Sequence, residues 1–146
     1  MNKITYAKDK MKNGGHSLVI LADCDTIISD GSGIKPLLET CDVVTDASEI
    51  YAADRIVGKA AAMLYVLMGA KGVFAQVLSR PAKELFERSG IEYEYETLTD
   101  NIINRSGDGL CPMESAVYDI DDPLTAKQAI IRKIGQLKND HVISRL

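Results

Sequence analysis

The sequence predicts an α/β domain, built as a three-layer α/β/α sandwich around a mixed β-sheet. Two apolar runs near the start form a hairpin, later apolar runs alternate with helices, and one long helix is apolar enough to need a sheet beside it. The chain has 146 residues, of which 46% are hydrophobic and 26% are charged, enough for one substantial core. We therefore expect one domain over residues 1–146, with the helix 1–14 and the tail 139–146 at its periphery.

The first part of the chain predicts a helix followed by a hairpin. A weak helix reaches about residue 13 and ends at Gly14-Gly15, which tolerate the left-handed backbone of a helix terminus. Residues 17–21 and 26–29 are apolar strands separated by a short polar break, so they form the hairpin. Pro36, at a first helical position, starts a short helix that ends near Cys41.

A long, mostly apolar helix is predicted over residues 46–68. Asp46 and Glu49 are spaced as in a capping box, although the helix can begin as late as residues 53–54. A helix that is apolar over most of its surface is buried on more than one side. We therefore expect this helix to pack on the sheet.

Strands and helices alternate after it. The sequence predicts a central strand over 72–78, a helix over 81–88 closed by Gly90, and a strand over 91–96. The last strand alternates apolar and acidic residues, which places it near an edge of the sheet, with Tyr93 and Tyr95 on its buried face.

Two more helices follow a loop at residues 98–110. Pro112 begins a short helix, and Pro123 begins the last one. One side of that last helix is predicted to carry its apolar residues, which are Leu124, Ile130, Ile131, Ile134 and Leu137.

Charge and composition exclude several classes of function. The net charge of −4 argues against a sequence-independent nucleic-acid binder, which needs a basic surface. No apolar run is long enough to span a membrane, and the start of the chain lacks a signal peptide, so we expect a cytoplasmic protein. Three cysteines without paired spacing, and two histidines, His16 and His141, without ligand partners at a recognisable spacing, predict neither a disulfide framework nor a metal site.

The segment Asn104–Glu114 concentrates groups that react or bind ligands in a glycine-rich loop. It supplies hydrogen-bond donors from Asn104 and Arg105, carboxylates from Asp108 and Glu114, and a thiol from Cys111. These groups predict one wall of a site.

Cys111 lies directly before Pro112, at the predicted N-cap of a helix. The positive end of a helix dipole makes a thiolate more reactive, and Arg105 would add to this if the loop folds back. Glu114 opposes it, because a carboxylate in the first turn competes for the same amides. A cysteine used only as a small apolar cap residue is the alternative.

A second cluster runs from Asp54 to Lys59. On the predicted helix, Arg55 and Lys59 share one face, and this like-charge pair indicates that an anion lies nearby. The anion can be Asp54, another carboxylate of the domain, or a phosphate of a ligand. An internal ion pair or a solvated face explains the same pattern. Gly58, which is unfavourable inside a helix, indicates close approach of another group.

Two turns are further candidates for anion binding. Gly33 and Lys35 lie in a glycine-rich turn that offers backbone amides and an ammonium group, although a turn between a strand and a helix needs the same glycines. Ser79 follows the central strand, where open α/β sheets place ligands, and a simple helix cap is its alternative role.

Three segments resemble the bacterial family known as domain of unknown function 1893: Gly33–Leu38, Asp54–Ala62 and Asn104–Glu114. With the order of elements, the resemblance covers roughly residues 15 to 135. It implies a cytidine-deaminase-like fold, which agrees with the predicted hairpin and the helices and strands that follow it.

The zinc motifs of deaminases are absent from this sequence. Such enzymes carry H-x-E at the start of the helix after the hairpin, and P-C-x-x-C where the next strand enters its helix. We place these positions at residues 53–55 and 79–82, which contain no histidine or cysteine. Without zinc there is no activated water for deamination, so the resemblance implies a location for a pocket and not an activity.

These inferences lead to one hypothesis and two alternatives. The leading hypothesis is a zinc-independent protein that binds a small anionic or nucleotide-like ligand and needs no cofactor. Asp54 and Lys59 form the floor of its site, with Arg55, Ser79, Gly33 and Lys35 near it; Cys111, Asp54 and Asp108 are the candidate catalytic residues. A persulfide-handling accessory protein and a non-catalytic regulatory domain are the alternatives, and a homodimer is compatible with the apolar content.

Overall fold

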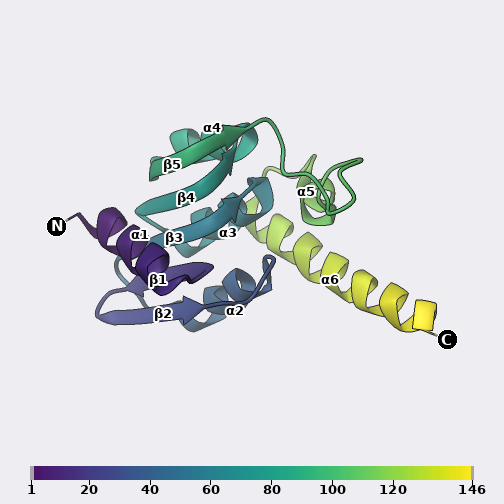
Figure 1. Ribbon diagram of the computed structural model, residues 1–146, viewed down its shortest axis with the longest axis horizontal. Coiled ribbons are helices and arrows are strands. Elements are labelled where there is room, and N and C mark those ends of the chain that lie inside the picture. Colours follow the sequence, from purple (N-terminus) through teal and green to yellow (C-terminus); the bar gives the residue numbers. More distant parts are fainter. Residues whose placement is uncertain (1, 146) are drawn as a thin grey trace.

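A mixed five-stranded sheet organises the chain in the computed structural model, which describes residues 2–145 and their side chains through residue 138 (Figure 1). The α/β class predicted from the sequence is confirmed. The elements in order are α1 (Lys3–Gly14), β1 (Leu18–Ala22), β2 (Asp25–Ser29), α2 (Lys35–Val43), β3 (Ile50–Val57), α3 (Lys59–Met68), β4 (Gly72–Ser79), α4 (Arg80–Ser89), β5 (Glu92–Thr99), α5 (Pro112–Val117) and α6 (Pro123–Arg145).

The strands lie in the order β2-β1-β3-β4-β5. β1 is antiparallel to both β2 and β3, whereas β3, β4 and β5 run parallel. Leu18 at the start of β1 pairs with Ser29 at the end of β2 and with Asp54 in the second half of β3. The turns that follow β2, β3, β4 and β5 are therefore all at one edge of the sheet, which we call the carboxyl edge.

The long helix predicted over residues 46–68 is wrong in its first part. Residues Ile50–Val57 form strand β3 in the middle of the sheet, and the helix begins only at Lys59. The capping-box spacing was misleading because the amides of Ser48 and Glu49 are bonded by the carboxylate of Asp23 in the β1–β2 turn. A strand buried between two neighbours is apolar along most of its length, as a buried helix is, so periodicity alone does not separate the two.

One face of the sheet is covered by α1. Its buried residues Ile4, Ala7 and Met11 pack on Val19, Leu21, Ala53 and Phe74. This helix, which the sequence places at the periphery of the domain, thus completes a second core. Its end at Gly15, with φ 66°, is as predicted.

Helices α2 to α6 contribute to the larger core on the opposite face, with α3 at its centre (Figure 1). α6 contacts α3 and α5 through a face that includes the fully buried Ala126 and Ile130. The prediction of one continuous apolar side is wrong for this helix, because Leu124 and Ile131 are 53% and 49% exposed. No helix in the described part of the chain is both long and apolar enough to cross a membrane.

β5 is an edge strand, as predicted. Tyr93 stacks against Phe86 of α4 and packs against the core, but Tyr95 is 39% exposed. The predicted buried face of this strand is therefore only half correct.

Candidate functional site

Glu114 connects the Asn104–Glu114 loop to the rest of the carboxyl edge. Its Oε1 accepts a hydrogen bond of 2.6 Å from the amide of Lys59, and its Oε2 accepts one of 2.9 Å from the amide of Ala60. These amides are the first of α3, where unpaired donors and the helix dipole attract an anion. The anion that the sequence predicts beside Lys59 is thus present, and it is a carboxylate of the domain.

Burial and hydrogen bonding act in opposite directions on Glu114. The side chain is 9% exposed, and its burial raises the pKa of the carboxyl, while the amides of Ala60 and Lys59 lower it. Gly58 is required next to it, because a Cβ at this position would lie 2.2 Å from Oε1 of Glu114 and 2.8 Å from Cγ1 of Ile102. The close approach predicted for Gly58 is confirmed, although Gly58 is the N-cap of α3 and not part of its interior.

The side chain of Lys59 also holds α5. Its ammonium donates a hydrogen bond of 3.0 Å to the carbonyl of Tyr118, the residue that ends this helix. Hydrogen bonds of Lys59 and Glu114 thus join both ends of α5 to the start of α3. The loop and α3 therefore form one unit.

The loop itself is shaped by Asn104. Its Oδ1 accepts hydrogen bonds from the amides of Gly107 and Asp108, and its Nδ2 donates to the carboxylate of Asp108 at 3.0 Å. The polar groups of Asn104 are thereby used within the turn. Asp108 and Arg105 lie exposed on the outer part of the loop.

Cys111 is at the N-cap of α5, as predicted, but its thiol does not cap the helix. Its backbone amide donates to the carbonyl of Ile102 at 2.9 Å, which closes the loop. The side chain is partly exposed. The thiol makes no capping hydrogen bond, so both interpretations from the sequence, a reactive thiol and a small apolar cap residue, stay open.

Asp54 lies on β3 and points toward α3. Its Oδ2 accepts a hydrogen bond of 2.8 Å from the hydroxyl of Tyr65, which is completely buried. Burial raises the pKa of the Asp54 carboxyl to about 7, and the hydrogen bonds from Tyr65 and from nearby amides only partly offset this. Burial also raises the pKa of Tyr65 well above its usual range. This carboxyl therefore changes its charge near neutral pH.

Arg55 does not share a helical face with Lys59, because it is on strand β3 and its side chain is exposed. Its guanidinium donates to the carbonyl of Gly15 at the end of α1. A cation at a helix carboxyl terminus is favourable, so Arg55 has a structural partner away from Lys59.

The other predicted residues have simpler surroundings. Ser79 is fully buried and its hydroxyl accepts from the amide of Ala82, so it caps α4. Gly33 has φ 76° in the turn before α2, a conformation that favours glycine. Lys35 is exposed, with its ammonium 4.0 Å from a carboxylate oxygen of Glu39. His141 lies outside the residues whose side chains are described.

Two residues that contact the candidate site were not identified from the sequence. Tyr65 partners Asp54, and Tyr118 partners Lys59 through its carbonyl. A tyrosine in an otherwise apolar helix was a usable signal, because a buried hydroxyl needs a hydrogen-bond partner. A backbone carbonyl leaves no such signal in the sequence.

Two cavities in the described part of the chain lie away from this site. One lies between α1, the β1–β2 turn and the start of β3, and the other lies beside α1 and β2. Within residues 2–138, no buried polar side-chain atom lacks a hydrogen-bond partner, and no three His, Cys, Asp or Glu side chains are grouped to hold a metal ion.

A mixed five-stranded sheet with helices on both faces, and a loop fastened by a buried glutamate to the start of α3, define an α/β domain with a candidate site at its carboxyl edge. The chain belongs to the family described as Domain of unknown function (DUF1893), whose model matches residues 6–134. It is similar to the crystal structure of a DUF1893 family protein (TM1506) from Thermotoga maritima, with 26% identity, 91% of each chain covered and a TM-score of 0.81. No match is found among curated proteins.

Proposed function

We propose that this domain binds a small anionic, nucleotide-like ligand at the carboxyl edge of its sheet. One observation carries the proposal. The three segments Gly33–Leu38, Asp54–Ala62 and Asn104–Glu114, which carry the family resemblance, meet at this edge through the pairing of β1 with β2 and β3 and the bonds of Glu114 to α3. Open α/β sheets bind ligands outside the carboxyl ends of their strands.

The order of elements supports a cytidine-deaminase-like arrangement. The helix after the hairpin is α2, and the next strand, β3, enters α3. The positions that correspond to the two zinc motifs are therefore Gly33–Pro36 and Val57–Ala60, not residues 53–55 and 79–82, because β3 is a strand. They contain Lys35 and Lys59 but no histidine or cysteine. Lysine at both helix starts favours an anion where such enzymes hold zinc.

The chemistry available differs across the site. Lys35, Lys59 and Arg105 supply positive charge for a phosphate or carboxylate. Asp54, with its pKa of about 7, can donate or accept a hydrogen bond near neutral pH and suits the edge of a base. A ligand with one anionic group and one hydrogen-bonding ring would bind both the cations and the carboxyl of Asp54.

Native mass spectrometry of freshly purified protein, followed by titration calorimetry with CMP, AMP, ribose 5-phosphate and inorganic phosphate, tests this proposal. We expect at least one organic phosphate to bind, and Lys35→Met and Lys59→Met each to weaken binding by about tenfold, as loss of a charged hydrogen bond does. Lys83→Met, which removes the same charge from α4, is the matched control and should bind normally. Absence of binding to all four probes, or equal binding by all three variants, contradicts the proposal.

The free thiol of Cys111 supports a covalent role as a second candidate, because the side chain has no capping hydrogen bond and is partly exposed. In that role the thiolate forms a bond to an electrophilic atom of the bound ligand and displaces a leaving group, which takes a proton from Asp54 or Asp108. In the persulfide-handling alternative the thiolate takes the outer sulfur of a donor persulfide, whose own thiolate leaves. Denaturing mass spectrometry of the fresh protein should show an adduct on Cys111 that is absent in Cys111→Ser. Unmodified Cys111, with unchanged ligand turnover in Cys111→Ser, excludes this role.

A further inference from the structure

The sheet ends in two edge strands, β2 and β5, which differ in how they are protected (Figure 1). An edge strand presents unpaired amides and carbonyls to any other strand, and proteins protect such edges with charges, prolines or bulges. β5 carries Glu92, Glu94 and Glu96 along one face. β2 contains no lysine, arginine or proline, and its register with β1 is continuous, without a bulge. The β2 edge is therefore the open one.

The hydrogen-bond pattern shows which backbone groups of β2 face outward. The amide of Arg55 in β3 donates to the carbonyl of Ser17, so the odd-numbered residues of β1 bond to β3 and the even-numbered residues bond to β2. In the β1–β2 register this leaves the N–H and C=O groups of Thr26 and Ile28 on the outer side. Outside the sheet, no backbone group of residues 2–145 bonds to them.

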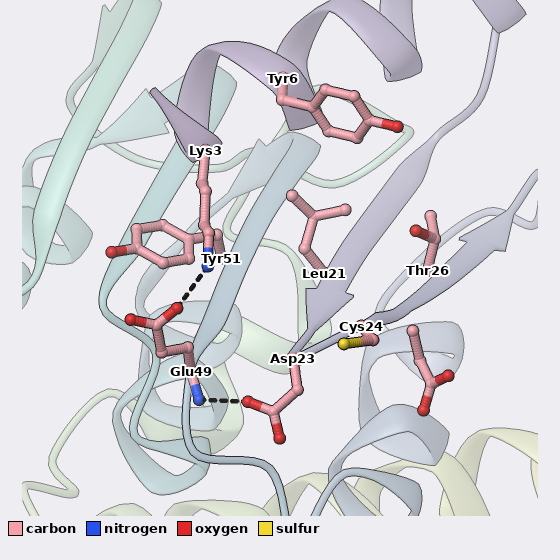
Figure 2. Close-up of a pocket in the computed structure, with 9 residues that line it drawn as sticks. Lys3, Tyr6, Leu21, Asp23, Cys24, Thr26, Glu49 and Tyr51 are labelled. Atoms are coloured by element: carbon pink, nitrogen blue, oxygen red, sulfur yellow. Dashed lines mark hydrogen bonds and ion pairs between the residues drawn. The ribbon is translucent and has the colours of Figure 1, made fainter. Parts of the chain in front are cut away.

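The side chains of this edge are β-branched and partly uncovered. Thr26 projects to the side of the sheet on which Leu21 and Tyr6 of α1 lie (Figure 2). Ile28 is 41% exposed on that side, because the buried residues of α1 pack on β1, β3 and β4. Ile27 projects to the other face, where it packs against the larger core. Such side chains pair favourably with β-branched residues of a neighbouring strand.

We propose that β2 pairs antiparallel with β2 of a second copy of the chain, in a register centred on Ile27. A two-fold axis perpendicular to the sheet relates the two copies and joins their sheets into one, which gives a closed dimer. Thr26 exchanges both of its backbone hydrogen bonds with Ile28 of the partner subunit, and Ile28 does the same with the partner's Thr26. This register uses every outward group of both residues and places Ile27 beside the partner's Ile27.

The charges of the two edges favour a second copy at β2 and oppose one at β5. In the register centred on Ile27, Asp25 lies opposite the partner's Ser29, so no carboxylate of β2 directly faces another. Two-fold pairing of β5 would place residues of the same face opposite each other, so that a glutamate meets a glutamate, as Glu94 meets the partner's Glu94. Like charges directly opposite each other are destabilising. Of the two edges, β2 is thus the one that fits its own copy.

Sedimentation velocity of the full chain, from micromolar to millimolar concentration, tests this pairing, and we expect a reversible monomer–dimer equilibrium. The double variant Thr26→Glu/Ile28→Glu places glutamate opposite glutamate and should weaken association by about tenfold or more. Thr26→Glu/Ile28→Lys places each glutamate opposite a lysine of the partner and should associate within about threefold of the unaltered chain. Tyr95→Glu/Thr97→Glu adds the charge of the first variant to β5, as a matched control, and should also stay within about threefold.

A chain that stays monomeric at millimolar concentration overturns the proposal. A dimer that persists unchanged in Thr26→Glu/Ile28→Glu uses another surface and overturns it too. So does an equal loss in Thr26→Glu/Ile28→Lys, which contradicts the register, or in the β5 control, which shows only repulsion between the net charges. All four substituted positions are exposed, so the variants should fold, and thermal unfolding of each confirms this.

Discussion

Gly58 and Glu114 form the contact on which the geometry of the candidate site depends. The missing Cβ of Gly58 leaves the space that the carboxylate fills, and the carboxylate supplies the acceptors that the first amides of α3 need. Neither residue can be exchanged independently of the other. This mutual dependence leads to a prediction for a double-mutant cycle.

Gly58→Ala should destabilise the domain by about 2–3 kcal/mol, because the new Cβ would lie 2.2 Å from Glu114 and displace a buried carboxylate from its donors. In the background of Glu114→Ala the same change should cost less, about 1–2 kcal/mol, because only the contact with Cγ1 of Ile102, at 2.8 Å, remains. Urea unfolding of the four proteins measures the coupling. Gly135→Ala is the control, since a Cβ there meets nothing within 4 Å in helix α6, and it should stabilise by about 0.5–1 kcal/mol. Additive costs at Gly58 and Glu114 would contradict the contact.

Asp54 should make stability depend on pH. Its pKa is about 7 in the folded state against 3.8 ordinarily, so the folded state holds this proton more tightly than the unfolded state. The stabilisation from this proton is complete below about pH 4 and is lost as pH rises to about 7, a decrease of about 2–4 kcal/mol in the free energy of unfolding. Urea unfolding from pH 4 to 7.5 should show this loss relative to Asp54→Asn. The raised pKa of Glu114 acts in both proteins and cancels. Parallel pH profiles of the two proteins would show that Asp54 titrates normally.

Helix α1 is the element whose importance differs most from the sequence-based expectation. Its buried residues form a separate core with β1, β3 and β4. Met11→Ala should therefore cost about 2–4 kcal/mol, as truncation in a well-packed core does. Ile131→Ala, at an exposed position of α6 predicted to face the core, should change stability by only about 0.5 kcal/mol. Thermal unfolding of both variants compares them, and equal losses would mean that the two faces are assigned incorrectly.

At the same scale, the sequence predicts most elements but not β3. The hairpin, α1, β4 and α4 have local signals, such as the glycine ends at Gly15 and Gly90 and the cap at Ser79. β3 has no such local signal. The residues before it are spaced as in a capping box, but the amides of Ser48 and Glu49 donate to Asp23 from another part of the chain. The error moved Asp54 and Arg55 from a strand onto a helix. An interaction between distant residues decided the local structure here, and single-sequence reasoning cannot see it.

At the scale of the whole molecule, the candidate site depends on segments far apart in the sequence. The prediction that the Asn104–Glu114 loop contacts the segment around Lys59 is confirmed by Glu114, while the pairing of Asn104 with Asp108 and of Asp54 with Tyr65 was not predicted. Chemical groups could be read from the sequence, but which of them satisfy each other could not. The loop is thus more fully occupied by internal bonds than its composition indicates.

The central claim is that Gly33–Leu38, Asp54–Ala62 and Asn104–Glu114 form one ligand site. Amide chemical-shift mapping by NMR, with an organic phosphate that binds in calorimetry, tests it most directly. We predict that the perturbed amides cluster in these three segments and that Lys59→Met abolishes the perturbation, while Lys83→Met preserves it. Perturbations confined to other parts of the chain, or to only one of the three segments, would contradict the claim.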